Sequence, residues 1–353
     1  MKNNTMKKVL SLSLALAMAL SLCACAGAGS QSTGSAASSS GSSSAAGSGS
    51  AGADTAFKVA VVKQMDHPSL DEICNAVVAQ LDQISQETGT PIEYEVYSGQ
   101  GDETVLNQIG AQVIADGVSA IIPIATTAAQ LMTVAAEETK TPVIYAAVSD
   151  PAQAELLDID YVTGTCDALN TEFILDMMLA QNPETKKVGL LYSLSEPNST
   201  TPIAEAKEYL DSKGIAYEEF TANSDDEVVA AAGALIAADV DAVFTPTDNK
   251  IQSAELAIAP DLIEAGIPHY AGADSFVRNG AFATCGVNYT LLGTETADLA
   301  YEMLTNGMEG KEDYYLSQGG IITVNTETAA AMGLDYSMFN DMGEVVEVVT
   351  TED

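Results

Sequence analysis

Six short polar loops follow apolar runs in this chain of 353 residues. In the first half the loops carry Asp66 and His67, Thr126 and Thr127, and Ser149. Side chains of these types can hydrogen-bond a small polar solute. They also cap helices, and we expect roughly half of them to serve as caps only.

The equivalent loops in the second half carry Asn198, Asp248, Asn249 and Asp274. A loop that opens a helix also presents free backbone N–H groups, which bind an anionic group such as a carboxylate. The two sets of loops are therefore candidates for one binding site.

Several sequence motifs that mark enzymes do not occur in the chain. There is no G-x-x-x-x-G-K-[ST] phosphate loop and no H-E-x-x-H metal motif. The two histidines, His67 and His269, have no paired cysteines at metal-binding spacing. Ser149 and His67 with an aspartate lack the G-x-S-x-G turn of a serine hydrolase. We expect no catalysis, no metal and no cofactor.

The net charge of the chain limits the classes of partner that it can bind. Lys and Arg total 13 against 50 Asp and Glu, which gives a net charge of −37. Nucleic-acid binding needs clustered cations, so it is excluded, and docking to an anionic membrane through a basic patch is disfavoured. The hydrophobic content of 47% indicates a folded chain rather than an acidic disordered tail.

Residues 1–25 have the pattern of a lipoprotein signal peptide. Lysines precede an apolar stretch at 9–22, which is shorter than the 20 or so residues of a membrane span. The end of the segment resembles a bacterial lipobox, with Cys25 as the lipidated residue, because small Ala24 precedes it and Leu22 stands third upstream. The alternative is an ordinary secreted protein cleaved nearby.

Residues 26–56 are mostly Gly, Ala and Ser and predict a flexible tether. About thirty such residues reach roughly 30 Å. A lipid at Cys25 followed by this tether predicts a globular body on the extracytoplasmic face of the cell membrane. Removal of the signal peptide leaves 10 basic and 50 acidic residues, a net charge of −40.

From residue 57 onward, short β-branched runs alternate with stretches of helical periodicity, which predicts parallel sheets covered by helices. Ser69 and Glu72 have the spacing of a capping box at the first helix. Three strand segments recur in the same order, at offsets of 129, 122 and 126 residues: 58–62 as 187–191, 119–122 as 241–244, and 142–145 as 268–271. The repeat predicts two similar α/β domains with a ligand cleft beyond the carboxyl ends of their strands.

Six blocks of sequence carry a resemblance to a known family: 58–71, 101–109, 125–130, 147–151, 246–249 and 271–275. Together they resemble the ABC-transporter substrate-binding lipoproteins of the tryptophan/tyrosine-binding type. The resemblance covers about residues 57–335. Ala125 stands where members of that family often have Gly, and Ser149 where Thr is common.

The resemblance implies a type I periplasmic-binding-protein clamshell, with two Rossmann-like lobes, parallel sheets and three crossovers. Lobe 1 is expected to comprise residues 57–164 plus 288–316, and lobe 2 residues 165–287 plus 317–345. A helix at about 290–306 would return to lobe 1, and the segment near 321–324 would cross back to lobe 2.

The resemblance also implies capture of a small solute, with an aromatic amino acid as the leading candidate, and its delivery to an ABC permease and the permease's ATPase. For an amino acid, Asp248 is the expected acceptor of the ammonium group, because an ionised acceptor gives the stronger hydrogen bond, and Asp274 is the alternative. Thr126, Thr127 and Ser149, with nearby backbone N–H groups, are the expected donors to the carboxylate.

Asn198 and Asn249 are expected to close the cleft from the second lobe, and Asp66 and His67 to border it from the first. His67 fits a loop or capping role equally well. A sugar- or nucleoside-binding protein of the same fold is one alternative, weakened for sugars by the lack of Trp. A ligand-sensing module for a membrane receptor is another, since both roles use the same clamshell.

Overall fold

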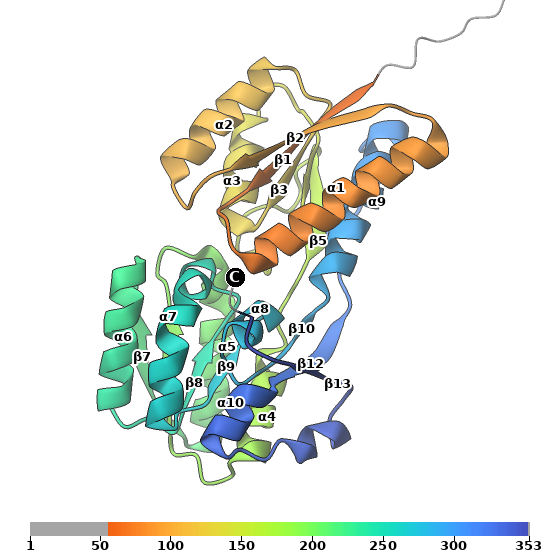
Figure 1. Cartoon of the computed structure of the whole chain (residues 1–353). Coiled ribbons are helices and arrows are strands. Elements are labelled where there is room, and N and C mark those ends of the chain that lie inside the picture. The colour runs from red at the N-terminus through yellow and green to blue at the C-terminus, as the bar shows by residue number, and fades with distance from the viewer. Residues whose placement is uncertain (1–55, 352–353) are drawn as a thin grey trace, which may run out of the picture. The chain divides into compact units, whose positions relative to one another are not determined.

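The computed structural model describes residues 56–351. The predicted signal peptide, nearly all of the predicted tether and Cys25 lie outside these residues. The described chain forms two β-sheets flanked by helices (Figure 1). No helix within the described range is both long enough and apolar enough to cross a membrane.

The first sheet has the strand order β11-β5-β4-β3-β1-β2, and all its neighbouring strands are parallel. Its strands are β1 (Phe57–Lys63), β2 (Ile92–Ser98), β3 (Ala120–Ile124), β4 (Val143–Tyr145), β5 (Val162–Cys166) and β11 (Tyr315–Leu316). Alternation along β1 divides its side chains between two cores. Val59 and Val61 belong to one buried cluster with residues of helices α1 (Pro68–Thr88) and α9 (Tyr289–Asn306). Figure 1 shows these two helices beside the first sheet. Ala60 and Val62 face α2 (Glu103–Ala115) and α3 (Thr126–Ala135).

The second sheet has the order β13-β12-β10-β9-β8-β6-β7, and only the β10–β12 pair is antiparallel. Its strands are β6 (Lys187–Tyr192), β7 (Ala216–Thr221), β8 (Ala242–Thr245), β9 (His269–Ala271), β10 (Ala283–Val287), β12 (Gly319–Asn325) and β13 (Val345–Val348). Its helices are α4 (Thr171–Gln181), α5 (Thr200–Lys213), α6 (Asp225–Ala237), α7 (Asn249–Ala265), α8 (Asp274–Arg278) and α10 (Thr326–Met332), with short 3₁₀ turns η1 (Pro197–Ser199) and η2 (Ser337–Asp341).

The duplication predicted from the sequence is confirmed. Five strands run β2-β1-β3-β4-β5 in the first sheet and β7-β6-β8-β9-β10 in the second. The three recurring segments fall on the pairs β1 and β6, β3 and β8, and β4 and β9, which hold equivalent places. Each lobe is thus a Rossmann-like unit, and the two together form the type I periplasmic-binding-protein fold.

The chain passes between the sheets three times: after β5 towards α4, after β10 towards α9, and between β11 and β12. Helix α9 packs along α1 on the first sheet, and β12 pairs with β10 in the second. The two helices approach closely at Gly293, where an added Cβ atom would lie 2.6 Å from the carbonyl oxygen of Ile73.

Replacing Gly293 with alanine is expected to lower the free energy of unfolding by about 1–3 kcal/mol, because the new methyl group must separate α1 from α9. Gly233 in α6 is the matched control, since a Cβ atom there meets nothing within 4 Å. Its replacement by alanine is expected to stabilise the protein by about 0.5–1 kcal/mol. Urea denaturation of both variants checks the pair, and a neutral Gly293 variant would contradict the close packing.

The capping box predicted at Ser69 and Glu72 is wrong. Helix α1 begins at Pro68 with His67 as its N-cap residue, and no side chain caps it. Proline suits the first helical position because it has no N–H to leave unsatisfied. The Ser69 hydroxyl is therefore free to contact the Ser275 hydroxyl in the other lobe.

Candidate functional site

One cavity lies where the carboxyl ends of the strands of both sheets meet. Its wall comes from the segments after β1, β3, β4 and β5 in the first sheet and after β6, β8, β9 and β10 in the second. The free volume inside it is about 20 Å³, roughly the room of one water molecule, so the two lobes are closed tightly around this site and must part to admit a solute.

Six of the nine residues expected at the site line this cavity: His67, Thr126, Ser149, Asn198, Asp248 and Asn249. All six are buried. The structure therefore brings together both sets of loops, which come from different halves of the chain.

Asp66, Thr127 and Asp274 do not belong to the cavity wall. Asp66 is exposed and binds Lys63 at 2.6 Å, and this hydrogen bond lowers the pKa of its carboxyl group. Asp274 is engaged by Arg278 one helical turn later, at 3.1 Å. Both carboxylates have cationic partners on their own side of the cleft, so neither is directed at a solute.

Asp248 reaches the cavity wall, but its carboxylate is occupied. As the N-cap of α7, its Oδ1 atom accepts from the backbone N–H groups of Lys250 and Ile251, each at 3.0 Å. Its Oδ2 atom accepts from the Ser193 N–H and the Ser199 hydroxyl, each at 2.7 Å. Burial raises the pKa of this carboxyl group, and these four donors oppose the increase. The geometry is that of a structural cap.

The hydroxyl of Ser149 also has partners within the protein. Its hydroxyl donates to Oδ1 of Asp167 at 2.9 Å and lies 3.1 Å from the Thr247 hydroxyl of the second lobe. A hydroxyl has one proton to donate, so that of Ser149 is not free for a ligand carboxylate.

The start of α3 presents free donors to the cavity. Ala125, the N-cap residue, has no side-chain oxygen and adopts φ 78°, in the region that favours glycine. The following Thr126 is 2% exposed, and its Oγ1 atom has no hydrogen-bond partner. An uncapped helix start beside a buried free hydroxyl is suited to a carboxylate.

A buried hydrogen-bond network joins the two lobes beside the cavity. Nε2 of His67 lies 2.9 Å from Oδ1 of Asn249, and Nδ2 of Asn249 donates to Oε2 of Glu196 at 2.8 Å. The other oxygen of Glu196 accepts from Nε2 of Gln64 in the first lobe at 2.8 Å. The lobes are thus in direct contact, as in a closed clamshell.

Burial changes the titration of this network. Desolvation raises the pKa of Glu196 to about 8, helped by the negative charge of nearby Asp248. Desolvation lowers the pKa of His67 to about 4, against the opposing effect of its bond to Asn249. The closed arrangement therefore favours a neutral histidine.

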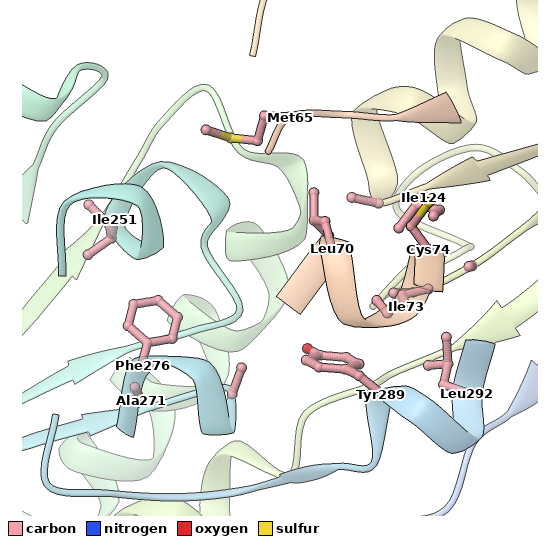
Figure 2. Close-up of a cluster of buried hydrophobic side chains, with 14 of the residues drawn as sticks. Met65, Leu70, Ile73, Cys74, Ile124, Ile251, Ala271, Phe276, Tyr289 and Leu292 are labelled. Carbon is pink, nitrogen blue, oxygen red and sulfur yellow. The ribbon is translucent and has the colours of Figure 1, made fainter. Parts of the chain in front are cut away.

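Part of the wall is apolar. Figure 2 shows Leu70 and Ile73 from the start of α1 and Phe276 from the second lobe, with the ring of Tyr289 between Ile73 and Phe276. These side chains belong to one buried cluster that includes residues from both lobes. They provide the apolar surface that would contact the non-polar part of a solute.

Several wall residues were not predicted from the sequence: Asp167, Gln252, Phe276 and Tyr289. Asp167 follows β5 and Tyr289 follows β10, so they hold equivalent places after the fifth strand of each repeat. The signal that could have found them is the extension of the repeat by one strand. Among the described residues, no group of three or more His, Cys, Asp or Glu side chains is arranged to hold a metal.

Four buried polar atoms of the wall have no partner: Nδ1 of His67, Oγ1 of Thr126, Oδ1 of Asn198 and Nε2 of Gln252. A buried polar group without a partner costs free energy of the order of 1–3 kcal/mol. The cavity is therefore arranged for a ligand that has both donors and acceptors.

Fold and cavity define a two-lobed α/β binding protein with its site between the lobes. The family model described as "ABC transporter substrate binding protein" matches residues 58–337. The chain belongs to this family.

The names of two relatives state a ligand. The chain is 27% identical over 281 residues to the tyrosine-binding protein of Clostridioides difficile (strain R20291), covering 78% of this chain and 81% of that protein. It is 26% identical to an ABC domain from Streptococcus pneumonia solved in complex with L-Trp, with a TM-score of 0.75 over 83% of this chain and all of that one.

A third relative bears on conformation. The ligand-free, open structure of a substrate binding protein with adhesive properties from Clostridium difficile is also 26% identical, covering 84% of this chain and 100% of that one. Its TM-score is 0.62, against 0.75 for the L-Trp complex at the same identity. The better match to the complex agrees with the direct contacts between the lobes.

Proposed function

We propose that this protein is the extracytoplasmic solute-binding component of an ABC importer, and that it binds an aromatic amino acid between its lobes for delivery to the permease. The observation that carries the proposal is the cavity between the lobes, with an uncapped helix start, buried unpartnered polar atoms and an apolar wall. Relatives named for tyrosine and solved with L-Trp favour the aromatic amino acids.

In this proposal the ligand carboxylate lies at the start of α3, bound by the Thr126 hydroxyl and the first backbone N–H groups of the helix. The aromatic ring packs against Leu70, Ile73 and Phe276. A ligand that touches both lobes stabilises the closed form, and the permease recognises that form.

A thermal-shift screen against amino acids, sugars and nucleosides tests the ligand class. A solute at 100 times its dissociation constant stabilises the protein by about 2.7 kcal/mol. We expect a clear increase in melting temperature with L-Trp, L-Tyr or L-Phe. A shift with ribose or a nucleoside, and none with any amino acid, would overturn the proposal.

Replacing Thr126 with valine is expected to weaken aromatic amino-acid binding about three- to tenfold, because one hydrogen bond is worth about 0.5–1.5 kcal/mol. Thr133 is a matched control on the same helix, since its hydroxyl is also buried without a partner but lies outside the cavity wall. Calorimetry should show unchanged affinity for Thr133→Val. Equal losses in the two variants would contradict the assignment of Thr126.

The contribution of His67 to ligand affinity is expected to fall as pH drops from 6.5 towards 4. His67 has a pKa of about 4 in the closed form and an ordinary value near 6.5 when the lobes separate, so acid favours the open form. The loss approaches tenfold per pH unit within this window. Glu196 titrates in the opposite sense, because its raised pKa favours closure at lower pH. The difference between the pH profiles of ligand affinity in the wild type and in His67→Gln therefore gives the contribution of the histidine. Identical pH profiles would contradict the prediction.

The lipid anchor is part of the same proposal. Cys25 and the tether would hold the body near the membrane, where the permease lies, although a net charge of −40 repels an anionic surface. Expression of the full chain and of Cys25→Ser, followed by membrane fractionation, tests the anchor. We expect the wild type in the membrane fraction and the variant in the soluble secreted fraction; equal distributions would refute it.

The importer role has its own test. Uptake of labelled ligand by cells that lack this chain should fall and should recover when the chain is restored. Unchanged uptake, with loss of a transcriptional response to the ligand, would instead identify a sensing module.

A further inference from the structure

Asp167 is the carboxyl group of the cavity wall with the fewest partners. It lies in the first crossover, between the end of β5 at Cys166 and the start of α4 at Thr171, and it is 4% exposed. Its Oδ1 atom accepts from the Ser149 hydroxyl at 2.9 Å, and its Oδ2 atom from the Tyr289 hydroxyl at 3.2 Å. Two neutral hydroxyls bind this carboxylate without balancing its charge.

The charges of the wall are unbalanced. Of the described residues that line the cavity, Asp167 and Asp248 are the acidic ones, and none is Lys or Arg. The carboxylate of Asp248 accepts hydrogen bonds from four donors, three of which are backbone N–H groups. A buried carboxylate with no nearby cation is costly unless it takes up a proton or gains a positive partner. Burial raises the pKa of Asp167, as this reasoning requires.

The position of Asp167 links it to both lobes. Tyr289 begins α9 at the second crossover, and the Ser149 hydroxyl also contacts Thr247 of the second lobe at 3.1 Å. Because Ser149 donates its proton to Asp167, Thr247 must be the donor in that second contact. Asp167 therefore lies where two of the three crossovers meet the cavity.

We propose that Asp167, rather than Asp248, accepts the ammonium group of the ligand, held in place by the hydroxyls of Ser149 and Tyr289. This inference rests on the proposed function, because it names the group that selects a zwitterion. The carboxylate at the start of α3 and the ammonium at Asp167 then fix the two ends of an α-amino acid. Solutes without a cationic group leave Asp167 unbalanced.

Ligands that lack one of the two charged groups of an amino acid test the proposal. L-Trp has both charged groups, whereas indole-3-propionate lacks the ammonium. Calorimetry on the purified wild type should show at least tenfold tighter binding of L-Trp. In Asp167→Asn the affinity for L-Trp should fall at least tenfold and that for indole-3-propionate by no more than threefold, so that the variant barely distinguishes the two.

The ratio of the two affinities separates ligand contact from a purely structural role. Mutation of a hinge residue that only shapes the cleft would weaken the binding of both ligands equally and leave the ratio of their affinities at its wild-type value. That result would overturn the inference. Should Asp167→Asn fail to fold, Ser149→Ala removes one of the two hydroxyls that hold the carboxylate, and the same ratio should change. An unchanged ratio there would equally overturn it.

A third ligand, tryptamine, gives the complementary test. Tryptamine keeps the ammonium and lacks the carboxylate, so its affinity should fall in Asp167→Asn and stay unchanged in Thr126→Val. Should no aromatic amino acid bind the wild type at all, the proposed function fails. Should L-Trp bind and Asp167→Asn still prefer it tenfold over indole-3-propionate, only the role of Asp167 fails.

Discussion

Replacing Asp248 with alanine is expected to lower the free energy of unfolding by about 3–5 kcal/mol, the sum of a lost helix cap and two orphaned buried donors. The cap bonds to Lys250 and Ile251 disappear, and the Ser193 N–H and Ser199 hydroxyl lose their acceptor. Asp248 is fully buried, so water does not replace these bonds without rearrangement of the loops. Urea denaturation measures the loss.

The matched control is Asp274→Ala. Asp274 occupies the equivalent loop after β9, but its side chain is partly exposed and pairs with Arg278 on the surface. An exposed ion pair contributes little, so the expected change is within about 1 kcal/mol. Equal stability losses for the two variants would contradict the structural role of Asp248. Asp248→Ala with native stability and abolished ligand binding would restore it as the ammonium acceptor.

Replacing Glu196 with alanine is expected to weaken ligand binding at least tenfold. The substitution leaves the side-chain amides of Gln64 and Asn249 buried without an acceptor whenever the lobes close. Each orphaned donor costs about 1–3 kcal/mol, and this cost falls on the closed form because an open cleft admits water. Since ligand binding requires closure, the cost appears as reduced affinity in calorimetry.

Thr201→Ala is the control for Glu196→Ala. The Thr201 hydroxyl also bonds across the lobes, to Oδ2 of Asp150 at 2.6 Å, but neither residue is buried. Water can replace that bond, so we expect an affinity within threefold of the wild type. An affinity of Glu196→Ala within twofold of the wild type would show that the buried network does not stabilise closure.

Periodicity predicted the repeated part of the fold because the central strands are continuous apolar runs. Residues 58–62 and 187–191 match closely, and they form the equivalent strands β1 and β6. The fifth strands were harder to find. Segments 162–166 and 283–287 combine Gly, Thr and Cys with few large apolar residues, so their hydrophobic signal is weak. Asp167 and Tyr289 follow these strands, which explains why the sequence did not single them out.

The type of a residue did not determine its role. Asp248 has the chemistry of an ammonium acceptor, but capping a helix and binding a ligand require the same residue type at the same place. Only the four donors around its carboxylate distinguish the two roles. The same limit applies to Ser149, whose single hydroxyl proton is given to Asp167. Pairings of this kind depend on side-chain directions that spacing along the chain does not specify.

We propose that the cavity between the lobes binds one aromatic amino acid. Titration calorimetry of the purified wild-type protein with L-Trp and with L-Tyr tests it most directly. We predict saturable binding with one ligand per chain, weakened in Thr126→Val and unchanged in Thr133→Val. No heat with any amino acid, together with saturable binding of a sugar or nucleoside, would contradict the account.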